Sequence, residues 1–177
     1  MARRFGSIRR VTAETRACHT LFWPYAQNMV GVTMEDRERP AVLHRNCVVC
    51  GRGSETGLRI DFRTVSAGRV EAVWHPEPAW CGYDGMLHGG IAAAMLDDAM
   101  VHALFSLGIA GVTAALELRY HLPVRTDAPV SLAAWRMRTR HRLHFLESSL
   151  VQNRRLCVHA SARFLAKPDT LAIHDHD

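Results

Sequence analysis

The segment HGGIAAAMLDDAM, residues 88–100, combines residue types suited to chemistry at a carbonyl group. Gly89 and Gly90 lack side chains, so a ligand can approach their backbone N–H groups at the start of the helix that follows. The helix dipole adds partial positive charge there, which suits a carbonyl oxygen that becomes negative during attack. Asp97 and Asp98 are the only acids in this apolar stretch, where a carboxylate is costly unless it is paired or used. We therefore expect at least one of them to face a polar site.

The spacing of His88 and Asp97 makes a prediction about assembly. Asp97 lies nine residues after His88, which is roughly 13 Å along a helix axis at about 1.5 Å per residue, and near the opposite face. One helix cannot bring both side chains to the same carbon atom. If both act on one substrate, they must come from two subunits with antiparallel central helices. We therefore expect a homodimer with the active site at its interface.

Alternation of apolar and polar residues predicts strands on both sides of this segment. In the last of them, Val158, Ala160, Ala162 and Phe164 all fall on the inward face. The strands over residues 130–139 and 143–152 change phase part-way, which predicts bulges, and QNRR is expected to form a short hairpin connection. The remaining strands are expected over residues 58–62, 69–75, 112–122 and 156–166.

A single long helix is expected over residues 88–107, with Gly108 placed to end it. This helix is apolar on nearly every side and must be wrapped. An antiparallel sheet that curls around it would cover one side, and the exposed edge of that sheet invites pairing with a second copy. The sequence therefore predicts one α+β domain over residues 44–167, with a partly irregular extension over residues 1–43 and a disordered tail over residues 168–177.

Charge and composition narrow the class of protein. The net charge of +5 comes almost wholly from arginine, since Lys167 is the only lysine. Arg136 and Arg138 begin a period-two series that either contacts phosphate groups or forms a solvated outer face. RNA binding is disfavoured because interleaved aromatic residues are lacking. The longest apolar run is interrupted by acids, so we expect a buried helix and no membrane contact. The odd number of cysteines predicts reduced thiols and therefore a cytoplasmic protein.

The cysteines predict free thiols and no metal. Their odd number, five, argues against a disulfide scaffold. With His44, two of them resemble half of a zinc site, but a closed structural site needs four ligands. The residues involved are Cys47 and Cys50, and only Cys81, or the distant pair of Cys18 and His19, would be candidates to complete the set.

Four segments in this order resemble the hotdog-fold acyl-CoA thioesterases of the PaaI-like branch, which are similar to 4-hydroxybenzoyl-CoA thioesterases. They are CVVCG with GLRIDF, GYDGMLHGGIAAAMLDDAM, VTAALELRYHLPV and ARFLAK, spread over residues 46–167. The resemblance implies a hotdog fold, in which an antiparallel sheet wraps one central helix. It also implies hydrolysis of an acyl-CoA to free acid and coenzyme A, without a cofactor, by a homodimer or a dimer of dimers.

The same resemblance implies roles for particular residues. The Gly89 amide would hold the thioester oxygen, and Asp97 of the other subunit would act as nucleophile or general base. Thr113 would position water, and His88 would orient the loop. The family often has Gln or Asn near the GY pair, where this chain has Cys81 and Gly82. Substrate contacts are expected at Gly90, Cys81, Gly82, Arg136 and Arg138.

Several alternatives remain open. Asp98 and His102 are four residues apart and would pair on the helix surface. The domain would instead bind or sense acyl-CoA without turnover, an alternative that Gly82 in place of a polar substrate contact leaves open. A hotdog dehydratase acting on a 3-hydroxyacyl thioester is disfavoured, because the spacing of histidine and acid fits the thioesterase pattern. The sequence does not predict which acyl group is bound.

Overall fold

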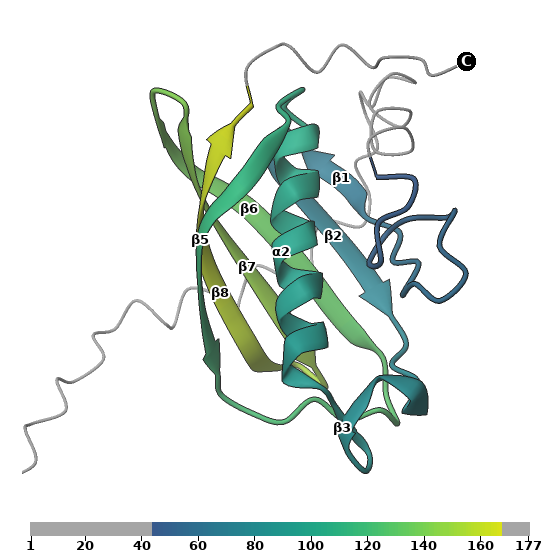
Figure 1. The fold of residues 1–177 in the computed structure, drawn as a ribbon. Helices are drawn as coiled ribbons and strands as arrows, with labels where there is room; N and C mark the ends of the chain where they lie inside the picture. The colour runs from purple at the N-terminus through teal and green to yellow at the C-terminus, as the bar shows by residue number, and fades with distance from the viewer. Residues whose placement is uncertain (1–43, 168–177) are drawn as a thin grey trace, which may run out of the picture. The chain divides into compact units, whose positions relative to one another are not determined.

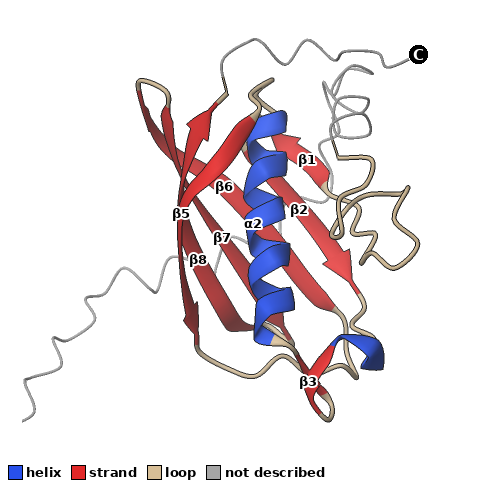
Figure 2. Ribbon diagram, in the orientation of Figure 1, coloured by secondary structure: helices blue, strands red, loops and turns tan. Residues whose placement is uncertain are grey.

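Residues 44–167 are the part of the chain that the computed structural model describes (Figure 1). The extension expected over residues 1–43, with Cys18 and His19, lies outside the described residues, as does the tail expected over residues 168–177. Within the described part, one long helix packs against a large antiparallel sheet. The predicted α+β class and hotdog arrangement are therefore confirmed (Figure 2).

The main sheet has six strands, and each neighbouring pair is antiparallel. In sheet order they are β1 (Arg63–Ser66), β2 (Arg69–Trp74), β6 (Val130–Arg140), β7 (Leu143–Gln152), β8 (Arg155–Ala166) and β5 (Gly111–Tyr120). The inward face predicted for the last strand is confirmed, since its four named residues are buried on β8. On β2, the alternate residues Val70, Ala72 and Trp74 are buried in the same way. The predicted bulges are present as register shifts between β6 and β7 and between β7 and β8.

The central helix α2 (Gly89–Phe105) lies against the face of the sheet and packs on β2, β5, β6, β7 and β8. Its core residues Met95, Leu96, Ala99 and Met100 are completely buried, as expected for a helix apolar on nearly every side. Gly108 follows the helix with a positive φ of 71°, a conformation that suits glycine at a helix end. In the described part of the chain, no helix combines the length and apolar character that crossing a membrane requires.

The strand predicted over residues 58–62 is wrong, although its alternating burial is correct. Leu58 and Ile60 are buried and Arg59 is exposed. However, Arg59 has a positive φ of 53°, which breaks an extended strand. The Leu58 and Ile60 amides donate to the carbonyls of Val48 and Val49 instead of joining the sheet. These residues thus form a clasp with residues 44–50, called the leader below.

The turn-rich segment between β2 and α2 is more regular than the expected loop. It contains the 3₁₀ helix η2 (Pro78–Trp80) and a small hairpin of β3 (Cys81–Tyr83) and β4 (Met86–Leu87). Gly85 lies between these two strands with a positive φ of 71°, a backbone conformation that would be strained in a residue with a side chain. The hairpin ends at His88 and therefore sets where α2 begins.

The packing of α2 on β6 predicts a large cost for shortening Leu132, which is completely buried. Leu132→Ala should lower the free energy of unfolding by about 2 to 5 kcal/mol, because it leaves a cavity under the helix. Val73 on neighbouring β2 is 64% exposed, so Val73→Ala should cost less than about 1 kcal/mol. Urea denaturation of both variants measures the difference, and equal losses would contradict this assignment of the core.

Candidate active site

His88 joins the β3–β4 hairpin to the start of α2. Its ring Nδ1 accepts a hydrogen bond from the Gly90 amide at 2.9 Å, which makes it the N-cap of the helix. Its own amide donates to the Trp80 carbonyl at 2.9 Å. Because Nδ1 accepts, the proton of the neutral ring must reside on Nε2. His88 therefore orients the loop and the helix terminus.

The Gly89 amide is left open by this arrangement. Among the described residues, no acceptor bonds the Gly89 N–H, whereas the Gly90 N–H is taken by His88. On its other side, Gly89 is held by the Tyr120 hydroxyl, which donates to the Gly89 carbonyl at 2.8 Å. A free N–H at a helix N-terminus can stabilise a developing oxyanion. Tyr120 was missed from the sequence, where it reads as an ordinary strand residue.

A hollow of about 530 Å³ lies beside this terminus. Its lining is mostly apolar and includes Gly82, His88, Gly89, Tyr120 and Val124. The lining residues do not include Cys81, whose sulfur lies 3.9 Å from the Thr126 hydroxyl. The structure thus brings Gly82 to the hollow, with His88 and Gly89, and leaves Cys81 outside its lining.

Gly82 packs tightly against His88. A Cβ atom at position 82 would lie 3.2 Å from the His88 ring and 3.3 Å from its Cα atom. Any side chain would therefore push the N-cap residue, and the glycine keeps the mouth of the hollow free of a polar group. This is the physical counterpart of the difference from the Gln or Asn expected near this position.

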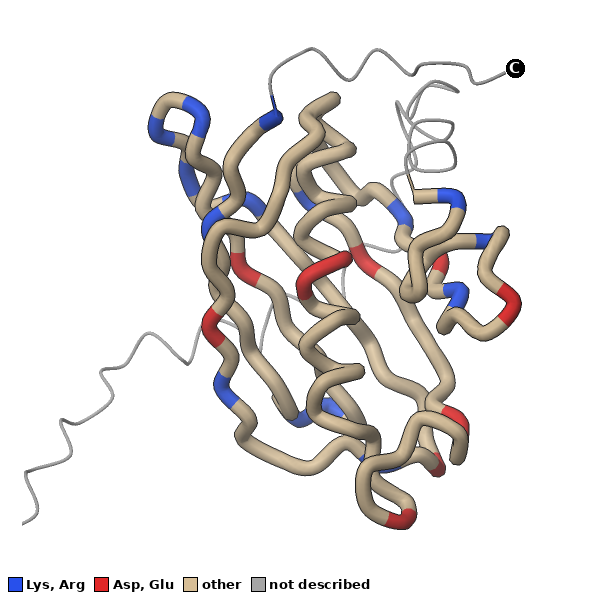
Figure 3. The backbone as a smooth tube through the Cα atoms, viewed as in Figure 1, with Lys and Arg blue, Asp and Glu red and all other residues tan. Residues whose placement is uncertain are grey.

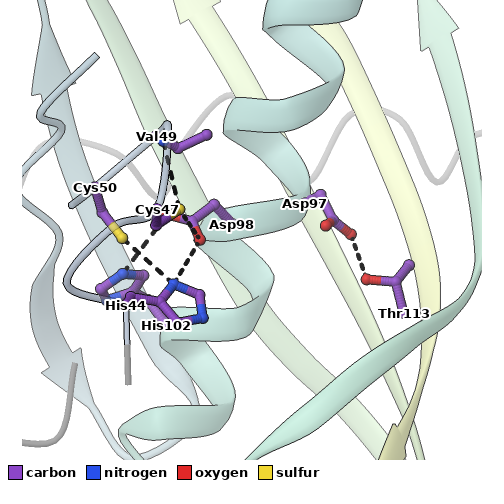
Figure 4. A network of polar contacts seen from close by, with 8 residues as sticks. All are labelled: His44, Cys47, Val49, Cys50, Asp97, Asp98, His102 and Thr113. Atoms are coloured by element: carbon purple, nitrogen blue, oxygen red, sulfur yellow. Dashed lines mark hydrogen bonds and ion pairs between the residues drawn. The ribbon is translucent and has the colours of Figure 1, made fainter. Parts of the chain in front are cut away.

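Asp97 lies in the middle of α2 and faces β5 (Figure 4). The Thr113 hydroxyl donates to its Oδ1 atom at 2.9 Å. Partial burial raises the pKa of Asp97, and the hydrogen bond from Thr113 offsets part of that rise. The two residues named as acid and helper are therefore in direct contact, with a carboxylate less stabilised by water than an exposed one.

The helix-terminal group and the acid are not brought together within one chain. Asp97 is absent from the lining of the hollow, as the separation of nine residues along α2 requires. Arg136 is farther still, because its side chain lies beside Gly68 and Leu107 at the C-terminal end of α2. Arg138 stacks on the Phe145 ring at 3.6 Å. Contact of either arginine with the same ligand as His88 would require a second subunit.

Asp98 points the opposite way from Asp97, toward the leader (Figure 4). Its expected pairing with His102 exists at 3.6 Å, but both residues are buried, so the expected surface location is wrong. Burial lowers the pKa of His102 to about 4. Asp98 also lies 3.1 Å from His44 Nδ1. Sequence reasoning missed this contact because His44 and Asp98 are far apart in the chain.

The capping role of His88 can be tested on stability. His88→Ala removes the acceptor of the Gly90 amide and should lower the free energy of unfolding by about 0.5 to 2 kcal/mol. Asn is a good N-cap, so His88→Asn should restore most of that loss. Thermal or urea denaturation measures both variants. Equal stability of all three proteins would contradict the capping role.

Residues 84–159 match the family model of the thioesterase superfamily. No curated protein sequence matches the chain. Among solved structures, one thioesterase superfamily protein is 26% identical, with a TM-score of 0.64. The likeness covers 68% of this chain and 63% of that one, so this chain spans less than two thirds of that protein.

Two further structures share the fold. A hypothetical thioesterase of Streptococcus pneumoniae, solved with coenzyme A, is 17% identical over 61% of this chain and 85% of that one, with a TM-score of 0.58. A phenylacetic acid degradation-related protein of Ralstonia eutropha is 24% identical over the same shares, with a TM-score of 0.56. The order of strands and helix, together with the match over residues 84–159, shows a hotdog fold similar to that of the thioesterase superfamily.

Proposed function

We propose that this protein hydrolyses an acyl-CoA to free acid and coenzyme A, at active sites formed between two subunits. The observation that carries the proposal is the half-buried Asp97 carboxylate, which is held by the Thr113 hydroxyl at 2.9 Å. A carboxylate in this setting is suited to attack a thioester or to take a proton from water. The open Gly89 amide provides the complementary group for the thioester oxygen.

The solved relatives support this choice of substrate and acid. The Streptococcus pneumoniae structure holds coenzyme A, and a Streptococcus mutans protein of the same fold holds acetyl-CoA. The pneumococcal protein was also solved as two variants, in which one aspartate or one threonine is replaced by alanine. Sixteen residues separate those two positions, the same separation as between Asp97 and Thr113. The pair chosen for study in that protein thus has the spacing of the pair found here.

The edge of the sheet supports assembly of the composite site. Strand β5 ends the sheet order, and its residues Val112 and Tyr120 are 45% and 55% exposed. Unpaired backbone groups and apolar side chains on an edge strand favour pairing with a second copy. Residues along β5 connect the two halves of the site, because Thr113 contacts Asp97 and Tyr120 contacts Gly89.

A twofold axis near the middle of β5 would unite these halves. Thr113 and Tyr120 are seven residues apart on the strand, or about 23 Å at roughly 3.3 Å per residue. In an antiparallel β5–β5 pair centred near Leu116, Thr113 faces the partner subunit's Tyr120. Asp97 then approaches the partner subunit's Gly89. We propose this register because it joins the acid and the oxyanion donor across the interface.

The chemistry at such a site is simple. Asp97 either adds to the carbonyl carbon or removes a proton from the water that does so, and the carbonyl oxygen becomes negative. The partner subunit's Gly89 N–H donates to that oxygen. The C–S bond then breaks, and coenzyme A leaves as the thiol after taking a proton. Where Asp97 attacks first, water next hydrolyses the anhydride, so both routes give free acid.

The remaining contacts are assigned by charge and polarity. The apolar hollow beside Gly82 and Gly89 suits the acyl or pantetheine portion of the substrate, and the expected contact at Gly90 falls outside its lining. Arg136 and Arg138 are exposed cations suited to the phosphates of coenzyme A, and would serve a site completed by the partner. The glycine at position 82 favours the alternative of a binding module without turnover, because it supplies no polar side chain to the reacting group. We also propose a cytoplasmic setting, in which thiols stay reduced.

The role of the acid is tested by Asp97→Asn. An amide of nearly the same shape can neither attack nor accept a proton, so kcat should fall by about 10² to 10⁴. Binding of coenzyme A, measured by calorimetry, should persist because the nucleotide contacts lie elsewhere. Asp127→Asn changes an exposed carboxylate in a distant turn and should leave kcat unaltered. Full turnover in Asp97→Asn would exclude Asp97 as the catalytic acid, whereas no turnover of any acyl-CoA by the unaltered protein would favour the binding module.

The composite site is tested by Gly89→Pro. Gly89 is the first residue of α2 and follows His88 with ψ of 131°, a position and a neighbour that accept proline. The substitution removes the N–H donor while keeping the helix, so kcat should fall by about 10² to 10³. Mixing this chain with Asp97→Asn chains should restore about a quarter of wild-type activity, since half the pairs are mixed and each has one intact site. No recovery of activity, with subunit exchange verified, would contradict an active site that combines Asp97 of one subunit with Gly89 of the other.

A further inference from the structure

Four potential metal ligands converge where the leader meets the middle of α2. They are His44 Nδ1, Cys47 Sγ, Cys50 Sγ and Asp98 Oδ1, and they all lie within 4.8 Å of one another (Figure 4). Three come from seven consecutive residues, and the fourth comes from the helix. This arrangement supplies the fourth ligand that the sequence pattern lacked. It does so without Cys81, which lies beside Thr126 instead.

The distances fit a tetrahedral ion. Zinc bonds sulfur, nitrogen and oxygen at about 2.0 to 2.3 Å, so neighbouring ligands of a tetrahedron lie about 3.3 to 3.8 Å apart. Cys50 Sγ lies 3.4 Å from His44 Nδ1, and Cys47 Sγ lies 3.6 Å from Asp98 Oδ1. His44 Nδ1 lies 3.1 Å from the same carboxylate oxygen. These three separations lie within a few tenths of an ångström of the tetrahedral values, and the other ligand pairs, all within 4.8 Å, need to close by up to about 1 Å around a central ion.

The backbone of the leader is shaped to present the two sulfurs. The Val49 amide donates to Cys47 Sγ at 3.4 Å, and the Gly51 amide donates to the Cys47 carbonyl at 2.8 Å. A Cβ atom at Gly51 would lie 2.5 Å from the Cys47 backbone, so no side chain fits there. Amide donors of this kind support a metal-bound thiolate. The CVVCG pattern thus has a physical reason, a tight turn that points both sulfurs at Asp98.

The buried negative charge of the cluster favours binding of a cation. Asp98 is only 5% exposed, and its Oδ2 atom makes no hydrogen bond among the described residues. Cys47 Sγ lies 3.6 Å from the Oδ1 atom of Asp98, and the sulfur of Cys50 lies within 4.8 Å of the same atom. A buried carboxylate beside two sulfurs is therefore short of positive charge. A divalent ion would neutralise it, and His102 at 3.6 Å from Oδ2 would orient the carboxylate from behind.

We propose that His44, Cys47, Cys50 and Asp98 bind one Zn²⁺ ion that fastens the leader to α2. Two thiolates and an imidazole select zinc over magnesium or calcium, which prefer oxygen ligands. Four protein ligands leave no open coordination position, so the ion is structural and takes no part in hydrolysis. The site lies on the opposite side of α2 from Thr113. It departs from the expectation of no metal and stands whether or not the protein is a thioesterase.

The first test is metal content. The full-length chain, expressed with zinc present and purified without chelator, should hold about one zinc per chain by mass spectrometric elemental analysis. Replacement by Co²⁺ should give the visible d–d bands of a tetrahedral site and a thiolate charge-transfer band in the near ultraviolet. This measurement needs no variant and is independent of folding defects. Less than about 0.1 metal per chain with no cobalt spectrum would overturn the proposal.

Matched cysteine variants assign the ligands. Cys50→Ser and Asp98→Asn should each weaken Co²⁺ binding at least about tenfold, and Cys50→Ser should also reduce the charge-transfer band. Cys157 is buried elsewhere in the sheet, so Cys157→Ser should retain one metal per chain. Cys18→Ser tests the alternative ligand considered from the sequence and should also retain it. Metal kept by Cys50→Ser, or lost by Cys18→Ser alone, would overturn the assignment.

The fastening role has its own readout. The Leu58 and Ile60 amides donate to carbonyls of the leader at 2.8 and 2.9 Å. Removing zinc with a chelator should speed hydrogen exchange of these two amides, while the amides shared by β7 and β8 stay protected. Unchanged exchange at Leu58 and Ile60 after complete metal removal would refute the fastening role. Chelation of Cys50→Ser provides the control, since that protein should show no further change.

Discussion

Two adjacent carboxylates lie in the middle of an apolar helix, where Figure 3 shows the acidic segment of α2 in red. Much of the surrounding structure offsets the free-energy cost of burying these two charges. Successive helical residues point about 100° apart, so Asp97 and Asp98 cannot share one polar partner. Asp97 turns to Thr113 on β5, and Asp98 turns to His44 and His102 on the other side. A buried charge without partners costs several kcal/mol. The leader and β5 therefore each provide a polar partner at the same level of the helix axis, on two sides of an otherwise largely apolar helix.

This division of α2 is also the reason why the proposed active site needs two subunits. The sheet covers the helix along one side and ends at β5, which carries exposed apolar side chains at both ends. The helix terminus near Tyr120 offers an N–H group and a hollow but no acid. The acid in the middle of the helix lies outside the lining of that hollow. In the dimer that we propose, two copies related by a twofold axis across β5 would supply each other with the missing half.

Much of this arrangement was predictable from the sequence, because apolar periodicity reports burial faithfully. The helix, the last four strands and the bulged register of β6 against β7 all follow from it. Periodicity does not report which carbonyl accepts the hydrogen bond of a given amide. It therefore predicts a strand over residues 58–62, although the amides of this segment bond to the leader instead of to the sheet. The prediction that Asp98 lies on the helix surface is wrong for a related reason. Its partners lie about 50 residues earlier, and only the fold brings them within 4 Å.

Gly82 shows how local packing can shape the chemistry of the hollow. The space beyond its Cα atom is filled by His88, which must hold its position to cap α2. A polar side chain at position 82 would gain a substrate contact only by displacing that cap. The chain therefore keeps a well-placed helix terminus and relies on backbone donors and apolar surface at the reacting end. If the hollow receives the acyl group as proposed, discrimination between acyl groups would rest on shape and on apolar area, which separate homologues differing by one methylene by only about 1 to 3 kcal/mol.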